Sequence, residues 1–145
     1  MITSNDLHVG LIGIVETWLN DGISDSEISL PGFTSYRKDR SSVKSGKGGE
    51  VLLYVHESLS STIAQNFTKL KTESVWCNIH VDKVKSLLVG CCYRSQQVAD
   101  NEIDDLYSAI RLASAQQVLI MGDFNFPHIN WSNLESNVNY LTSNF

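Results

Sequence analysis

Several polar side chains occur where apolar runs of this sequence end, and their types are those that hydrolytic sites use. The runs cover residues 7–15, 86–93 and 118–121, and runs of this kind are typical of buried strands. Strand ends present side chains to solvent from a rigid base, which suits them to binding and catalysis. The polar residues at these ends are Glu16, Tyr93, Arg94, Asp123 and Asn125.

The spacing of Asp123 and Asn125 suits a site that activates water. If the strand stays extended through residue 125, both side chains point to one side, where a carboxylate can accept a proton and an amide can orient substrate. Glu16 suits Mg²⁺, which prefers oxygen ligands and often takes one carboxylate beside water and phosphate. Tyr93 and Arg94 donate hydrogen bonds and suit a phosphate. The alternative for Asp123 and Asn125 is a turn, which both residue types commonly form.

A basic segment, residues 37–47, stands out in an acidic chain. It holds five basic residues against one acidic residue, whereas the chain as a whole has 11 against 16 and a net charge of −5. The segment is either a solvated loop or a surface that contacts nucleic-acid phosphates, because basic side chains release counterions from the phosphate backbone. Its basic residues are Arg37, Lys38, Arg40, Lys44 and Lys47.

The elements that must position these residues are short strands and one helix. The run 7–15 is expected to be a strand covered on both faces, because it is apolar throughout. Residues 82–85 are expected to form the turn of an antiparallel hairpin. Apolar residues recur at helical spacing from Asp100 to Ala113, which predicts a helix. The other expected strands are 33–36, 51–55, 74–81, 86–93 and 118–121.

Length and composition favour one domain. The chain has 145 residues, of which 42% are hydrophobic, so it can bury a core. Its longest apolar run is about half the roughly 20 residues of a membrane-spanning helix, and we expect no membrane insertion or secretion. An odd number of cysteines, three, favours buried reduced thiols in an intracellular protein. The tryptophans are expected to pack rather than to stack on bases; they are Trp18, Trp76 and Trp131.

Taken together, the motifs resemble the endonuclease/exonuclease/phosphatase superfamily. The resemblance is closest to the apurinic-type endonuclease domain of non-LTR, LINE-like retrotransposons. It extends from about residue 7 to residue 131. The matching stretches are IVETWL (14–19), LPGF (30–33), YRKDR (36–40), GGEV (48–51), ESVW (73–76), YR (93–94) and MGDFN (121–125), followed by Pro127 and Trp131.

The resemblance implies a fold and an activity. The fold is α/β, a DNase-like four-layer sandwich of two mixed β-sheets flanked by helices, incomplete within residues 1–145. The activity is Mg²⁺-dependent hydrolysis of DNA phosphodiesters, with Mn²⁺ as the alternative metal, for nicking that primes reverse transcription. Glu16 is then expected to bind the metal, Tyr93 to touch the scissile phosphate, and Asp123 and Asn125 to position and activate water. The expected partners are DNA and a reverse transcriptase of the full-length polyprotein, in the nucleus.

The sequence also departs from the family pattern. The opening strand with its asparagine and the closing Ser-Asp-His motif of the family have no counterpart here. Glu50 stands where a third glycine is typical, and Ser95 stands where a proline is typical. We therefore expect a fragment with weak or no nuclease activity alone. The alternative is a non-catalytic remnant that binds nucleic acid or protein, and a phosphatase-type member of the superfamily is less expected.

Overall fold

The computed structural model describes residues 9–39, 50–95, 100–126, 129–130, 132 and 135–136. Its elements in chain order are β1 (Leu11–Val15), β2 (Phe33–Lys38), β3 (Val51–His56), β4 (Ser61–Ile63), the 3₁₀ helix η1 (Gln65–Phe67), β5 (Glu73–His80), β6 (Ser86–Tyr93), α1 (Asp100–Ala113), β7 (Val118–Asp123), β8 (Ile129–Asn130) and β9 (Glu135–Ser136). The predicted β6 and α1 are confirmed at both of their ends. No helix in this described part of the chain is long and apolar enough to cross a membrane.

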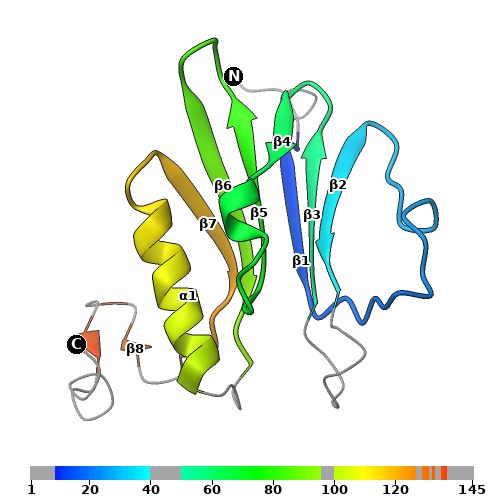
Figure 1. Ribbon diagram of the computed structural model, residues 1–145. Coiled ribbons are helices and arrows are strands. Elements are labelled where there is room, and N and C mark those ends of the chain that lie inside the picture. The colour runs from blue at the N-terminus through cyan, green and yellow to red at the C-terminus, as the bar shows by residue number, and fades with distance from the viewer. Residues whose placement is uncertain are drawn as a thin grey trace.

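The strands form two larger sheets and one small hairpin (Figure 1). One sheet has the order β1-β3-β2 and is antiparallel throughout. The other has the order β4-β5-β6-β7, antiparallel except for the parallel pair β6 and β7. Strands β8 and β9 pair with each other. The predicted hairpin of β5 and β6 is confirmed, whereas β4 was not expected.

The parallel pair follows from α1, which connects the end of β6 to the start of β7. A parallel connection needs a crossover of about a dozen residues, and a helix commonly supplies it. In the register of this pair Tyr93 lies opposite Asp123. The crossover therefore brings two of the predicted site residues to one edge of the sheet.

The main core lies between the inner faces of the two sheets. Alternate residues of β3 face alternate residues of β5 and β6, as the two-residue period of strands requires. The buried members are Val51, Leu53, Val55, Val75, Cys77, Ile79, Val89 and Cys91. The three cysteines are free and buried, as expected. Burial raises the pKa of Cys77 and Cys91 to about 11 and that of Cys92 to about 12.

The outer faces of the two sheets are covered differently. Helix α1 and η1 cover the four-stranded sheet, where Leu106 and Ala109 pack with Trp76 (Figure 1). The three-stranded sheet is covered by the loop of residues 16–32, which buries Leu19 against the sheet. Among the described residues the helical layer is therefore present on one side only. The expectation of helices flanking both sheets is corrected accordingly, because that loop takes the place of a helix.

Strand β1 is an edge strand among the described residues and none of its residues is fully buried, so the prediction that it is covered on both faces is wrong. Its one partner in the described structure is β3, and Ile14 is 40% exposed. The inner strand of this sheet is β3, which is buried from Val51 to Val55. Gly13 lets β1 approach the other sheet closely, because a Cβ there would lie 2.8 Å from Met121 Sδ. This close approach positions the residue that follows β1, Glu16.

Candidate active site

Strands β1, β6 and β7 end at the same edge of the sandwich. Gly13 of β1 lies against Met121, two residues before Asp123. At the ends of the strands the hydroxyl of Tyr93 donates a hydrogen bond to Oε1 of Glu16, although the two residues are 77 positions apart. Tyr93 is also the register partner of Asp123. The structure thus brings together three residues that the sequence analysis singled out.

Negative charge surrounds Tyr93 at this edge. The hydrogen bond to Glu16 contributes most to raising the pKa of Tyr93 to about 12, followed by burial and the charges of Glu16, Glu73 and Asp123. Because negative neighbours and burial both disfavour a phenolate, Tyr93 stays protonated at neutral pH and acts as a hydrogen-bond donor. We call this region the acidic edge, defined by Glu16, Glu50, Glu73, Tyr93 and Asp123.

Strand β7 ends at Asp123, and the chain then turns. Asn125 has φ of +46°, so it is not extended and does not share a face with Asp123 as predicted. Its backbone N–H donates to Oδ1 of Asp123 at 3.0 Å, and its side-chain amide donates to the carbonyl of Arg94 at 2.8 Å. The turn-forming alternative is therefore what the structure shows, while Asp123 itself remains exposed at the end of the strand.

Arg94 holds the segment that follows Asp123. Its backbone N–H donates to the carbonyl of Asp123 at 2.8 Å, and its guanidinium Nη1 donates to the carbonyl of Asn125 at 2.8 Å. The guanidinium also lies 4.4 Å from the ring centroid of Phe126, a cation–π contact. These bonds direct the side chain of Arg94 toward the protein. The phosphate contact expected of Arg94 stays a prediction.

Four residues other than glycine have positive φ in the described structure, and all four lie at or beside strand ends of this edge. The values are 54° for Glu16, 59° for Trp18, 56° for Glu50 and 46° for Asn125. Such a conformation costs an L-residue about 1–2 kcal/mol, so neighbouring contacts must hold it. Strain of this kind clusters at functional sites, which agrees with the position of the acidic edge.

Sequence reasoning did not identify Glu50 as part of the site. Its side chain is 5% exposed, and Oε2 accepts a hydrogen bond from the backbone N–H of Trp18 at 3.1 Å. The available signal was the departure from a third glycine at this position. Glycine is typical where φ is positive, so a glutamate that occupies such a position needs another reason, and here its carboxylate holds the segment after Glu16.

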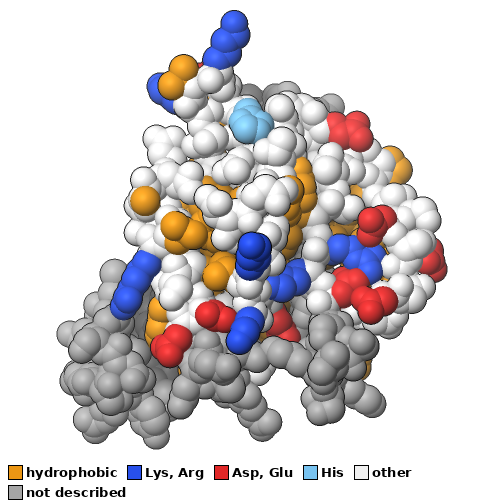
Figure 2. Space-filling model, viewed as in Figure 1, with side chains coloured by type: hydrophobic (Ala, Val, Ile, Leu, Met, Phe, Trp, Pro, Cys, Tyr) orange, Lys and Arg blue, Asp and Glu red, His pale blue; other side chains and the backbone are white. Residues whose placement is uncertain are grey.

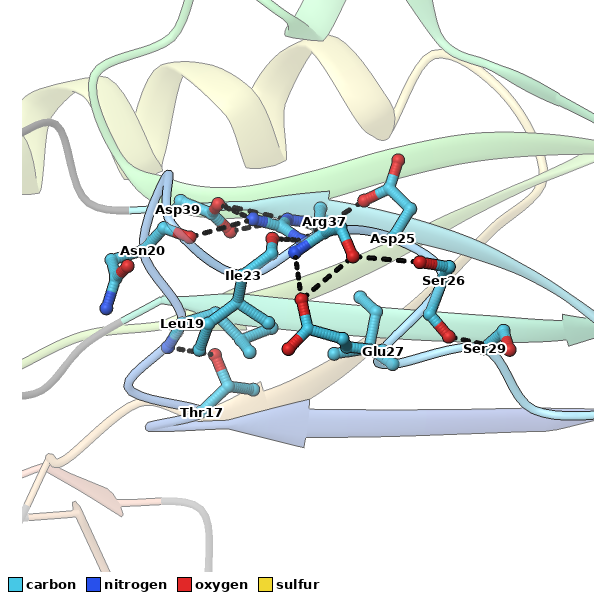
Figure 3. Close-up of polar contacts among 12 residues, drawn as sticks. Thr17, Leu19, Asn20, Ile23, Asp25, Ser26, Glu27, Ser29, Arg37 and Asp39 are labelled. Atoms are coloured by element: carbon cyan, nitrogen blue, oxygen red, sulfur yellow. Dashed lines mark hydrogen bonds and ion pairs between the residues drawn. The ribbon is translucent and has the colours of Figure 1, made fainter.

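Arg37 has structural partners in place of the expected phosphate. Its guanidinium binds the carboxylate of Asp39, donates to the carbonyl of Ile23 at 2.8 Å and to that of Asn20 at 3.2 Å (Figure 3). Nη1 also lies 3.1 Å from Oδ1 of the exposed Asp25. The Asp39 carboxylate raises the pKa of Arg37 further above its ordinary value. Arg37 therefore organises the loop that covers the three-stranded sheet.

Of the other basic residues in this segment, one binds within the protein and three are not described by the structure. The ammonium group of Lys38 donates to the carbonyl of Leu70 and thereby joins β2 to the segment before β5. Arg40, Lys44 and Lys47 lie outside the described residues. A nucleic-acid contact by this segment stays a prediction, and it now depends on those three side chains.

The donor chemistry of the acidic edge fits Mg²⁺. Glu16 and Asp123 are exposed carboxylates at adjacent strand ends. The described residues contain no group of three His, Cys, Asp or Glu side chains placed to hold a metal by themselves. Mg²⁺ commonly binds through one or two carboxylates and completes its shell with water and substrate phosphates. Two carboxylates therefore suffice where a phosphate is the substrate.

Comparison with protein families agrees with this geometry. The endonuclease/exonuclease/phosphatase family matches residues 2–141. The chain belongs to this family. No curated protein sequence is significantly similar to the chain. Members of the family are generally metal-dependent phosphodiesterases, so membership implies hydrolysis of phosphate esters. The two packed sheets and the α-helix found among the described residues are consistent with the α/β fold of this family.

Proposed function

We propose that this chain is a metal-dependent DNA endonuclease domain that hydrolyses phosphodiester bonds at the acidic edge. The family match supports hydrolysis of phosphate esters. The observation that carries the proposal is the Tyr93 to Glu16 hydrogen bond, together with Asp123 at the register position opposite Tyr93. A phenol donor between two carboxylates at one edge is suited to a phosphate flanked by a cation and an activated water.

The proposed roles follow from the chemistry of each side chain. Glu16 would hold Mg²⁺ or Mn²⁺, whose bound charge stabilises negative charge on the phosphate oxygens. Tyr93, which its raised pKa keeps protonated, would donate a hydrogen bond to a phosphate oxygen in place of its present bond to Glu16 once Glu16 holds the metal. Asp123 would accept a proton from the attacking water. Asn125 would keep Asp123 oriented through its backbone N–H, and its bond to Arg94 holds the turn in place.

The proposed biological setting is a non-LTR retrotransposon. The support is the sequence resemblance, above all the stretches IVETWL at 14–19 and MGDFN at 121–125. In such an element the 3′ end of the nick primes reverse transcription by a polymerase in the same polyprotein, acting in the nucleus. We propose that the DNA backbone is contacted by Arg40, Lys44 and Lys47, because they gather positive charge in one segment of an otherwise acidic chain.

The test is nicking of supercoiled plasmid by the purified chain with Mg²⁺ and with EDTA. The expected result is weak Mg²⁺-dependent nicking, as anticipated for this chain alone, that Glu16→Gln and Asp123→Asn each reduce to the level seen with EDTA, because losing one positioned catalytic group costs about 10²-fold or more. Asp104→Asn, an exposed carboxylate on α1, is the matched control and should nick like wild type.

Two results would count against the proposal. Nicking that survives both Glu16→Gln and Asp123→Asn would place the chemistry elsewhere. Binding of DNA without any Mg²⁺-dependent nicking would favour a non-catalytic domain, and hydrolysis of inositol phosphates instead of DNA would favour a phosphatase-type member.

A further inference from the structure

Trp18 is exposed, although its residue type favoured burial in the core. Its side chain is 56% exposed, and it is the one aromatic residue among the exposed large hydrophobic side chains of the described part of the chain. Trp76, by comparison, is 1% exposed and packs in the core as expected. Isolated apolar residues on a surface need no explanation, so exposure alone carries no argument. The backbone of Trp18 provides a second observation.

The backbone of Trp18 is held in a conformation that a bulky residue rarely adopts. Its φ is 59°, in the left-handed region, and its N–H donates to the buried carboxylate of Glu50 at 3.1 Å. On one side Glu16 is tied to Tyr93, and on the other Leu19 is buried under the three-stranded sheet. The indole is therefore exposed to solvent on a backbone whose conformation is held by contacts on both sides. A side chain fixed and exposed in this way is suited to binding a ligand.

Trp18 lies next to the proposed metal ligand. Two residues of extended chain span about 7 Å at most, so the α-carbon of Trp18 is within about 7 Å of that of Glu16. Successive bases of one strand are about 3.4 Å apart along a duplex. An indole on that α-carbon would come within reach of the nucleotides adjoining a phosphodiester held at Glu16.

We propose that Trp18 is a stacking platform for an unpaired base beside the bond that is cut, so that the site prefers locally unpaired DNA. The inference rests on the proposed function and adds the kind of substrate. An aromatic side chain can stack on any base, but in a paired duplex both faces of each base are already covered. Only an unpaired or displaced base offers a free face to the indole.

The charge of the site supports stacking as a source of affinity. The acidic edge carries Glu16, Glu73 and Asp123 together with the buried Glu50. Figure 2 shows Asp and Glu side chains alongside Lys and Arg side chains in the lower part of the face it displays. Without a bound cation such a surface repels the phosphates of DNA. Stacking on an aromatic residue does not depend on charge in this way, so Trp18 adds attraction to that of the metal and of the hydrogen bond proposed for Tyr93.

The test compares the affinity of the full chain for two labelled DNAs with Ca²⁺ in place of Mg²⁺. One is a fully paired duplex, and the other is the same duplex with a short unpaired bubble. Trp18→Ala should weaken binding to the bubble about 5- to 150-fold, the range for stacking of one base on an aromatic residue, and should leave the paired duplex within about twofold. Val84→Ala, which alters a 92% exposed side chain in the distant β5–β6 turn, should change neither affinity.

Two further variants separate stacking from an effect on folding. Trp18→Gly relieves the positive φ, so it should fold at least as well as wild type and still lose the preference for the bubble. Trp18→Phe should retain most of the affinity. Binding of the bubble should quench tryptophan emission in wild type and much less in Trp18→Phe, a signal that a purely structural role of Trp18 would not produce.

The outcomes distinguish this inference from the proposed function. If Trp18→Ala and Trp18→Gly bind the bubble as wild type does, while Glu16→Gln abolishes nicking, the stacking role is wrong and the nuclease stands. If wild type neither nicks nor binds either DNA, both are wrong. Equal loss of affinity for both DNAs would also overturn the inference, because stacking on an unpaired base predicts a selective loss.

Discussion

Replacement of Arg37 tests whether this residue is a structural centre or a DNA contact. The side chains of Arg37 and Asp39 are 17% and 14% exposed, and the guanidinium also binds the carbonyls of Ile23 and Asn20. Arg37→Ala would leave a largely buried carboxylate and two carbonyls without their donor. We therefore expect the loop of residues 16–32 to loosen and the free energy of unfolding to fall.

The size of the effect can be worked out from these contacts. A hydrogen bond to a charged group contributes about 1.5–3 kcal/mol, and breaking a buried ion pair by removing one partner costs about 3–5 kcal/mol. The pair with Asp25 adds at most about 1 kcal/mol, because that carboxylate is 79% exposed. Arg37→Ala should thus lower the free energy of unfolding by about 3–5 kcal/mol. Arg37→Lys should lose about half of this, since an ammonium cannot reproduce the planar fork.

The assay is urea denaturation followed by circular dichroism, with Lys69→Ala as the control. Lys69 is exposed, and its replacement should change stability by no more than about 0.5 kcal/mol. A double-mutant cycle with Asp39→Ala should give a coupling energy of about 1–3 kcal/mol. DNA binding should be measured in parallel over a range of salt concentrations.

One result would refute the structural role of Arg37. If Arg37→Ala keeps the stability of wild type and instead reduces the slope of log affinity against log salt by about one, Arg37 contacts a phosphate. The network with Asp39 would then be absent when DNA is bound.

Two other predictions concern the strand ends. Gly122→Ala should lower the free energy of unfolding by more than about 4 kcal/mol in urea denaturation, because the φ of Gly122 is +140° and a Cβ there would lie 1.8 Å from the carbonyl oxygen of Cys92. Gly22→Ala, in an exposed turn, is the control and should cost far less. Equal losses of stability from the two substitutions would contradict this reasoning. In an ultraviolet titration of phenolate, Tyr93 should ionise near pH 12 rather than at the ordinary value of 10, and Tyr93→Phe should remove that step. The contribution of protonated Tyr93 to stability is present below pH 10 and is lost as the pH rises toward 12. Ionisation of every tyrosine near pH 10 would contradict the contact of Tyr93 with Glu16.

Local pattern was enough to predict most elements and the residue types at their ends. The period of apolar residues predicted α1 and the strands, since each element needs an apolar face or stripe of its own period. Strand β6 and helix α1 were predicted at both ends because turn residues and a polar helix start adjoin them. The three-residue strand β4 was missed, because so short a segment shows no period.

The sequence could not predict which strand lies inside the three-stranded sheet. Residues 7–15 and 51–55 were both expected to be apolar strands, and coverage on both faces was expected of 7–15. Pairing decides the matter, because β3 has a partner on each side and β1 has β3 alone in the described structure. For Asn125 the sequence left an extended position and a turn open, and the structure shows the turn, in which the side chain of Asn125 binds the carbonyl of Arg94.

By itself, the sequence determined that carboxylate, phenol and amide groups stand at strand ends, because their positions along the chain follow from local apolar patterns. Only the tertiary structure decided that Glu16 meets Tyr93, that Glu50 holds Trp18 and that Arg37 binds inward. These contacts join segments far apart along the chain. Their formation depends on how the two sheets pack and on where loops close, and neither leaves a local signal in the order of residues.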